Sequence, residues 1–126
     1  MSLRSTSHLS FAQERLWFLE QWEPGSTAYL LSYAWQLRGP LNRPALDAAL
    51  TVLVARHESL RTAFGLVDEV PVQMIMPPTP VALSFLDLAD LPEIRREAKV
   101  RRFIQEEALR PFDLTISPPC RGPLPR

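Results

Sequence analysis

Few residues of this 126-residue chain combine the side-chain types and spacing that covalent chemistry or metal binding requires. The two histidines, His8 and His57, are far apart in sequence and lack paired cysteine or histidine ligands at the spacing of a metal site. The four glycines do not cluster, so there is no glycine-rich phosphate loop. Ser59 follows His57 by two residues, but no nucleophile elbow surrounds it. The residues therefore predict no catalytic centre, no directly bound cofactor and no metal site.

His57 has two readings, because it falls on the apolar stripe of a predicted helix. A core histidine bonded to backbone or carboxylate groups is the more common arrangement at such a position. A general base would need a partner and a cleft that the sequence does not show. Arg56 and Arg61 flank the stripe on opposite sides, and a guanidinium at the margin of a core usually clamps a carboxylate or free carbonyl groups. We interpret all three as structural residues.

A cationic face lies on the predicted last helix, at about residues 92–110. Its members are Arg95, Arg96, Lys99, Arg101 and Arg102. It could dock an acidic protein or a nucleic acid, but glutamates are interspersed, and a solvated face with internal ion pairs is more common. The chain has 14 basic and 14 acidic residues, and this zero net charge argues against a nucleic acid partner.

Composition indicates an ordinary globular chain in a reducing compartment. A single cysteine, Cys120, excludes an internal disulfide. No apolar run approaches the roughly 18 residues of a membrane helix, and no signal-peptide pattern is visible at the start. We expect a cytoplasmic location and no membrane partner.

Hydrophobic periodicity predicts the order helix, strand, helix, strand, strand, helix, which is an α/β or α+β arrangement. The predicted elements span residues 11–21, 29–37, 43–62, 70–76, 81–86 and 92–110. Ser10 and Gln13 form a capping-box pattern before the first helix, which is apolar on more than one side and should be heavily buried. Asn42 should cap the second helix, and Asp68-Glu69 should form a turn.

Two elements have the clearest patterns. The strand at 29–37 places five bulky residues on one face, which suggests a sheet with more strands and helices than the chain supplies. They are Tyr29, Leu31, Tyr33, Trp35 and Leu37. The helix at 43–62 carries a single apolar stripe. Its members are Leu46, Leu50, Leu53, His57, Leu60 and Phe64. In the last helix, the residues expected to face inward are Ile94, Ala98, Val100, Ile104 and Ala108.

The two ends of the chain are expected to be irregular. Residues 1–8 are small and polar without periodicity, and we expect them to be disordered. Five of the 13 prolines fall in the last sixteen positions, so residues 115–126 should form an irregular tail. One ordered unit is therefore expected, at residues 9–114.

Two long motifs resemble the first two core motifs of the condensation domains of non-ribosomal peptide synthetases. Residues 9–19, LSFAQERLWFL, resemble Ser-x-Ala-Gln-x-Arg-Leu-Trp-x-Leu, with the first serine aligned on Ser10. Residues 56–64, RHESLRTAF, resemble Arg-His-Glu-x-Leu-Arg-Thr-x-Phe at every specified position. The resemblance covers roughly residues 8–114, and near the end Gly122-Pro123-Leu124 echoes a family phrase whose surrounding prolines should block a strand.

The resemblance implies part of the N-terminal lobe of a chloramphenicol-acetyltransferase-like fold. In that family two carrier proteins present phosphopantetheine-tethered thioesters, and the acceptor amine attacks the donor thioester to form an amide. The central family motif is His-His-x-x-x-Asp-Gly, and no His-His pair occurs in this sequence. The matched motif positions are then expected to hold the scaffold rather than react. They are Gln13, Arg15, Trp17, Arg56, His57, Glu58, Arg61, Thr62 and Phe64.

Three hypotheses follow from the resemblance. The first is a truncated condensation domain that is inactive alone, with the proline-rich end suggesting a frameshift. The second is a non-catalytic module that docks a carrier protein or a neighbouring part of a synthetase. The third, a small acyltransferase assembled from several copies, is the weakest, because no copy supplies the histidine motif.

Overall fold

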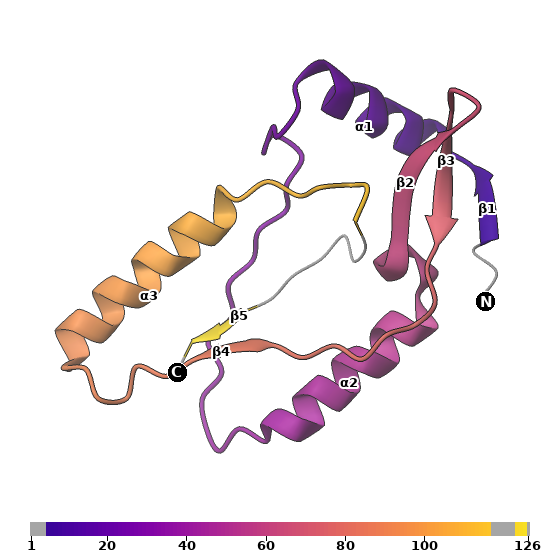
Figure 1. The fold of residues 1–126 in the computed structure, drawn as a ribbon. Coiled ribbons are helices and arrows are strands. Elements are labelled where there is room, and N and C mark those ends of the chain that lie inside the picture. The colour runs from indigo at the N-terminus through magenta and orange to yellow at the C-terminus, as the bar shows by residue number, and fades with distance from the viewer. Residues whose placement is uncertain (1–4, 117–122, 126) are drawn as a thin grey trace.

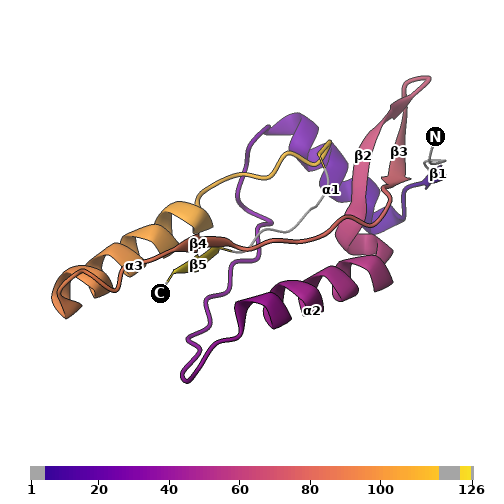
Figure 2. The same ribbon diagram turned by 60° about the horizontal axis from the view of Figure 1, so that its bottom comes forward.

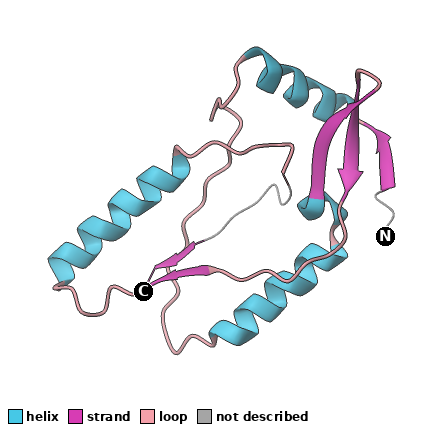
Figure 3. Cartoon of the chain, in the orientation of Figure 1, coloured by secondary structure: helices cyan, strands magenta, loops and turns pink. Residues whose placement is uncertain are grey.

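A computed structural model gives the fold, and it describes residues 5–116 and 123–125. The three-stranded sheet and α3 lie at opposite ends of the molecule, with α1 and α2 between them (Figures 1 and 2). The elements, in chain order, are β1 (Ser5–His8), α1 (Phe11–Trp22), α2 (Arg43–Arg56), the 3₁₀ helix η1 (Glu58–Arg61), β2 (Thr62–Val67), β3 (Val70–Ile75), β4 (Ser84–Leu86), α3 (Glu93–Ala108) and β5 (Pro123–Pro125). The predicted mixture of helices and strands is confirmed, as Figure 3 shows.

An antiparallel sheet of order β1-β3-β2 forms the larger of the two sheets. Its hairpin runs from the pair Thr62–Ile75 to the pair Val67–Val70. The two turn residues, Asp68 and Glu69, both have positive φ, 50° and 65°. Two left-handed residues in a two-residue loop match the twist of the flanking strands. The predicted turn at Asp68-Glu69 is therefore confirmed, but β2 was missed.

The first residues of the chain form an edge strand, so the expectation of disorder over residues 1–8 is wrong for residues 5–8. Residues 1–4 lie outside the described part of the chain. Strand β1 pairs with β3 from Ser5–Ile75 to His8–Val72. The Gln73 side chain donates a hydrogen bond of 3.0 Å to the carbonyl oxygen of His8. Backbone pairing of a polar edge strand leaves no apolar alternation, which is why periodicity did not reveal it.

Helix α1 begins with the predicted capping box. The Ser10 hydroxyl accepts from the Gln13 N–H at 3.3 Å, and the Gln13 carboxamide oxygen accepts from the Ser10 N–H at 2.8 Å. Heavy burial of the helix was predicted, and this is wrong. Trp17 is its only buried residue, whereas Phe11, Phe18 and Trp22 are largely exposed. The described part of the chain provides no second layer over those side chains.

Removing the cap of α1 should cost measurable stability. We expect Ser10→Ala to lower the free energy of unfolding by about 1 kcal/mol, because the Gln13 N–H loses its acceptor. Urea unfolding followed by tryptophan fluorescence measures this change. The matched control is Ser59→Ala, since Ser59 is exposed on η1 and no side-chain hydrogen bond of it occurs in the described structure. Equal losses in the two variants would contradict the capping role.

Residues 29–37 do not form the predicted strand. They run as an irregular segment in the connection from α1 to α2 (Figures 1 and 2). Within the described residues, no backbone hydrogen bond joins residues 31–37 to another segment. A strand exists only by pairing, and the described chain supplies no neighbour for this one. Bulky and small residues do alternate over residues 29–37, but the backbone of this segment has no partner strand in the described chain.

Helix α2 has the predicted start and an earlier end. Asn42 caps it, since its side-chain oxygen accepts from the Ala45 N–H at 3.1 Å. It was expected to reach residue 62 but ends at Arg56, and His57 is extended with φ −110° and ψ 102°. Phe64 lies in β2, where its N–H donates to the Leu114 carbonyl at 2.8 Å. The last third of the predicted helix forms η1 instead, and pairing with β3 begins at Thr62, so strand pairing overrides the helical stripe only at Phe64.

Strand β4, helix α3 and strand β5 form a β-α-β unit, with the two strands parallel. The register joins Ser84 to Pro123 and Leu86 to Pro125. The expectation that prolines keep residues 115–126 irregular is thus wrong for residues 123–125. Alternate residues of a strand direct their N–H groups to the same side, so prolines at 123 and 125 are compatible with pairing through Leu124. Residues 117–122 lie outside the described structure.

Helix α3 packs loosely. None of its residues is buried, and the predicted inward face is wrong at the exposed positions Ile94, Ala98 and Ile104. Val100 and Ala108, also predicted to face inward, are half-buried, as are Arg96, Phe103 and Glu107. The core of the described chain is small. It consists of Leu9, Trp17, Val54, Ala63, Val72 and Leu88.

No helix in the described ranges is long and apolar enough to cross a membrane.

Candidate functional site

The second sequence motif folds into a joint between η1 and the hairpin, and Arg61 is its centre. Its Nη1 donates to the Met76 carbonyl oxygen at 2.5 Å, and its own carbonyl accepts from the Met76 N–H at 2.9 Å. Its Nη2 also lies 3.1 Å from Glu58 Oε1. Thr62 donates from its hydroxyl to the Glu58 carbonyl at 2.7 Å. The Arg61 side chain is only 14% exposed, whereas its carboxylate partner Glu58 is 61% exposed, so the guanidinium is shielded and the ion pair lies at the edge of the joint.

One atom of this joint has no partner. Arg61 Nε is buried and makes no hydrogen bond within the described structure. A buried N–H donor without an acceptor is costly. The clamp is therefore complete for the two terminal nitrogens of Arg61 and incomplete for Nε.

The first motif makes a smaller joint between α1 and the sheet. Gln13 Nε2 donates to Gln73 Oε1 at 3.2 Å, and Gln73 in turn reaches the backbone of β1. Trp17, one turn further along α1, is 8% exposed and belongs to the core. Phe64 is half-buried in β2. These positions link the N-terminal segment to the central strand of the sheet.

The other predicted polar positions are not brought into these joints. Arg15 and Arg56 are exposed, and neither side chain makes a hydrogen bond within the described ranges, so the clamps predicted for them are not seen. His57 is exposed as well, which makes its interpretation as a core histidine wrong. The error has a simple cause. The helix ends at Arg56, so His57 never reaches the apolar stripe.

Sequence reasoning missed the two partners that complete the joints, Gln73 and Met76. Gln73 is the one polar residue of the strand Val70–Ile75, and that position was a visible signal. Met76 contributes only backbone atoms, which leave no trace in the sequence.

Removing the Arg61 clamp should destabilise the hairpin. We expect Arg61→Ala to lower the free energy of unfolding by about 1–3 kcal/mol, because the half-buried Met76 carbonyl loses its donor. Arg56→Ala is the matched control, and a change within about 0.5 kcal/mol is expected for this exposed side chain. Chemical unfolding of both variants measures the difference. A loss as large in Arg56→Ala would show that the effect is not specific to the clamp.

The described residues contain little that could carry out a reaction. No group of three or more histidine, cysteine, aspartate or glutamate residues there could hold a metal ion. A single carboxyl, Asp113, has a clearly shifted pKa, which hydrogen bonds from the Thr115 hydroxyl at 2.6 Å and the Thr115 N–H at 2.9 Å lower. Asp113 is an exposed turn residue, so this shift indicates a local turn and not an acid or base.

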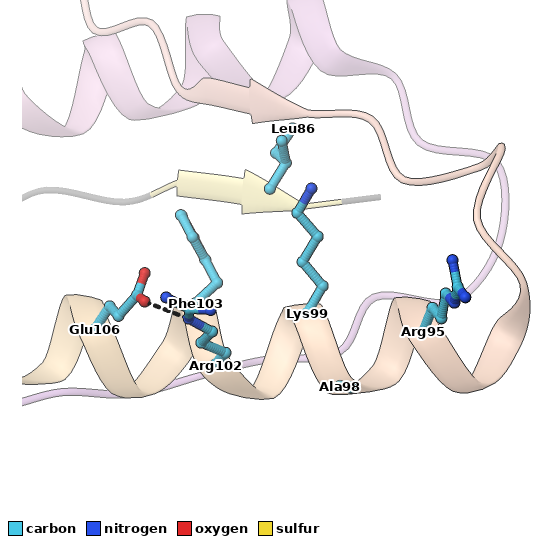
Figure 4. Close-up of a pocket in the computed structure, with 7 residues that line it drawn as sticks. All are labelled: Leu86, Arg95, Ala98, Lys99, Arg102, Phe103 and Glu106. Carbon is cyan, nitrogen blue, oxygen red and sulfur yellow. Dashed lines mark hydrogen bonds and ion pairs between the residues drawn. The ribbon is translucent and has the colours of Figure 1, made fainter.

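An open hollow of about 470 Å³ lies along α3 beside β4 (Figure 4). It is lined by Leu86, Arg95, Ala98, Lys99, Arg102, Phe103 and Glu106. Arg102 pairs with Glu106 at 2.7 Å. Arg95 and Lys99 have no ion pair in the described structure, so the hollow combines an apolar floor with two free cations. Glu97 and Glu93, also on α3, lie outside its lining.

The comparisons with known proteins agree with one another. The family model described as "Condensation domain" matches residues 4–124. Chondramide synthase cmdD of Chondromyces crocatus is 45% identical over 94% of this chain, which spans 3% of that protein. Cyclosporin synthetase simA of Tolypocladium inflatum is 41% identical over 93% of this chain and 1% of its own length.

Solved structures give the same result. The first condensation domain of the calcium-dependent antibiotic synthetase, in complex with a substrate analogue, matches 90% of this chain with a TM-score of 0.74 and 28% identity. Another structure of that domain matches 94% with a TM-score of 0.76. The chain covers 27% and 31% of those two structures, so it is about a quarter to a third of their length.

Proposed function

The chain belongs to the condensation-domain family of non-ribosomal peptide synthetases, and from this premise we propose that it is a scaffold portion of the N-terminal lobe, inactive by itself. In the complete domain it would support amide-bond formation between two carrier-bound thioesters. The proposal is supported by the match over residues 4–124 and by the likeness to about a quarter of a solved condensation domain.

The reaction needs a binding tunnel and a positioned amine, not a cofactor held by this chain. The acceptor amine attacks the carbonyl carbon of the donor thioester. A C–N bond forms, the C–S bond breaks, and the donor thiol leaves with the proton that the amine gives up. Both substrates would arrive on the phosphopantetheine arms of partner carrier proteins.

The role of these residues in that reaction would be support. The observation that carries the proposal is that both matched motifs lie in joints of the fold. The first joins α1 to the sheet through Gln13 and Gln73, and the second joins η1 to the hairpin through Arg61 and Met76. Neither joint holds a nucleophile beside a base. The reactive motif of the family, His-His-x-x-x-Asp-Gly, does not occur in the sequence.

Grafting tests the scaffold role. Residues 4–124 would replace the matching segment in chondramide synthase cmdD, which is 45% identical over the aligned part. We expect the chimera to form dipeptide on its carrier proteins in a single-turnover assay. The control changes the second histidine of the recipient's own histidine motif to alanine and should be inactive. A chimera that folds and binds both carriers but forms no product would refute the proposal.

A second candidate function, a carrier-protein docking module, is favoured by the hollow on α3. Its two free cations, Arg95 and Lys99, line it together with apolar Leu86 and Phe103, a combination suited to an acidic protein surface. If the chain docks a carrier protein, Arg95→Glu with Lys99→Glu should abolish binding measured by calorimetry. Arg15→Glu with Arg56→Glu, an equal charge change at exposed positions of α1 and α2, should leave it intact. No binding by the unaltered chain would remove this candidate.

A further inference from the structure

The inward face of α2 is half polar. The residues of this helix that are buried or half-buried recur at every third and fourth position, as one stripe of a helix requires. They are Arg43, Leu46, Asp47, Leu50, Thr51 and Val54. A polar group on such a face is costly unless it has a partner. The partners lie in the chain that leads into β4 and runs beside α2 (Figures 1 and 2).

The Thr51 hydroxyl makes the first of these contacts. It accepts a hydrogen bond of 2.9 Å from the Val81 N–H. A threonine inside a helix often donates its proton to the carbonyl four residues earlier, and Thr51 does so to Asp47 at 2.9 Å. The Val81 carbonyl oxygen is farther, at 3.4 Å, so the single hydroxyl proton goes to Asp47. The bond from the Val81 N–H is therefore an additional contact, which the local habit of threonine does not explain.

Two further contacts follow at one and two helical turns before Thr51. The Asp47 carboxylate accepts from the Leu83 N–H at 3.1 Å. The Arg43 guanidinium lies 4.0 Å from the centroid of the Phe85 ring, which is a cation–π distance. Positions 51, 47 and 43 of α2 therefore meet positions 81, 83 and 85, in that order.

The repeats of the two segments fit each other. Four residues of an α-helix rise about 6 Å, and two residues of an extended chain rise about 6.6 Å. A contact at every fourth residue of α2 thus coincides with one at every second residue of an extended chain that runs antiparallel to it. The burial of that chain alternates accordingly. Val81, Leu83 and Phe85 are half-buried, whereas Ala82 and Ser84 are exposed.

These contacts leave the other edge of the chain for β5. Alternate residues of a strand direct their N–H groups to the same edge. The N–H groups of Val81 and Leu83 go to α2, so those of Ser84 and Leu86 face the opposite edge, where β5 pairs with β4 through Leu124. Strand β4 is held by backbone on one edge and by side chains of α2 on the other.

We propose that Arg43, Asp47 and Thr51 form a side-chain ladder, through which α2 takes the place of a neighbouring strand and fixes the register of β4. Thr51 and Asp47 supply the acceptors that the carbonyl groups of a strand would supply. A slip of one residue would turn the exposed residues of the segment toward α2. It would also displace Leu88, which follows β4 by two residues and is 2% exposed.

The ladder also determines one wall of the hollow on α3, and this consequence rests on the docking function proposed for that hollow. Leu86 of β4 lines the hollow opposite α3 (Figure 4). None of the three ladder residues belongs to its lining. They are therefore positioning residues, which hold the Leu86 wall in place without contacting what binds there.

Amide hydrogen exchange followed by NMR tests the ladder in the chain of residues 1–126. Thr51→Val removes the hydroxyl and keeps a β-branched side chain. We expect the Val81 N–H to exchange about fivefold faster or more in this variant, the effect of one lost hydrogen bond, and Thr51→Ser to restore slow exchange. Asp47→Ala should accelerate the Leu83 N–H in the same way, whereas Asp47→Asn keeps an acceptor oxygen and should not.

Val52→Thr is the matched control, because it makes the reverse change at the neighbouring position. Val52 is 63% exposed, and the ladder does not include it. We expect the exchange rates of the Val81 and Leu83 N–H groups to be the same in this variant as in the unaltered chain.

Calorimetry of carrier-protein binding tests the consequence for the hollow. Thr51→Val should weaken binding several-fold, and Thr51→Ser should restore it, although position 51 lies outside the hollow. If the unaltered chain binds no carrier protein, the docking function is refuted, and the exchange rates still decide the ladder. Undiminished binding by Thr51→Val would refute the positioning role for the hollow.

Two results of the exchange experiment would overturn the ladder itself. One is exchange of the Val81 and Leu83 N–H groups in the unaltered chain at the rate of an unfolded peptide. The other is equal acceleration in Thr51→Val and Thr51→Ser, which would show that the hydroxyl is not the acceptor.

Discussion

Replacing Leu88 by alanine is expected to lower the free energy of unfolding by about 3 kcal/mol, the usual cost of a buried leucine-to-alanine change. Leu88 is 2% exposed and is the largest fully buried side chain of the described chain. Its carbonyl accepts from the Leu91 N–H at 3.0 Å in the turn between β4 and α3. The cavity would therefore open where the β-α-β unit begins.

The small size of the core makes this loss severe. Only six apolar residues are buried in the described ranges, so few other contacts can absorb the change. A domain is stabilised by about 5–15 kcal/mol in total, and a protein with so small a core should lie near the lower limit. We expect the Leu88→Ala variant to retain about 2 kcal/mol and to unfold at a much lower urea concentration than the unaltered chain.

Leu109→Ala provides a control with the same chemical change. Leu109 is 71% exposed, and its replacement should alter stability by no more than about 0.5 kcal/mol. Urea unfolding followed by tryptophan fluorescence compares the two variants. Equal effects would mean that Leu88 is not part of a packed core in solution.

The features predicted correctly from the sequence depend on local contacts. Ser10 caps α1, Asn42 caps α2, and Asp68-Glu69 forms the turn before β3. Each is decided by hydrogen bonds or backbone angles within a few residues, so the local sequence contains the information. The family membership was also recognised from two contiguous motifs.

The features predicted wrongly depend on partners far away in the sequence. Strand β1 needs β3, about 65 residues later, and β5 needs β4 across the whole of α3. Residues 29–37 show the reverse case, a strand pattern that finds no partner. In all three segments, the presence or absence of a partner strand decides whether a strand forms. The sequence of one segment alone does not show whether such a partner exists.

The residues of the candidate site also divide into those that the local sequence identifies and those that depend on partners far away in the sequence. Arg61 could be singled out from the second motif, but its acceptor is a backbone carbonyl of Met76, fifteen residues later. His57 was misplaced because the apolar stripe assumed a helix continuing past Arg56. Hairpin formation ended that helix, and only the tertiary structure reveals the competition.

A mixture of residues 1–126 with donor and acceptor carrier thioesters is expected to form amide no faster than the carriers alone. Enzymes accelerate reactions by about 10⁶-fold or more, so this is the largest difference that the proposal predicts. A general base must reach the attacking amine and be oriented by a neighbouring group. Both histidines, His8 and His57, are exposed, and neither makes a side-chain hydrogen bond within the described structure.

The activity of residues 1–126 alone is compared with that of the chimera, in which the same residues are part of a complete condensation domain. There His57→Ala should leave the single-turnover rate within about twofold, because an exposed residue outside the reactive motif supplies no transition-state stabilisation. Mass spectrometry of the acceptor carrier would detect the dipeptidyl product in both experiments. Product formed by residues 1–126 alone, above the rate of the carriers, would show that this portion of the lobe contains a reactive group of its own. A large loss of chimera activity in His57→Ala would assign that group to the second motif.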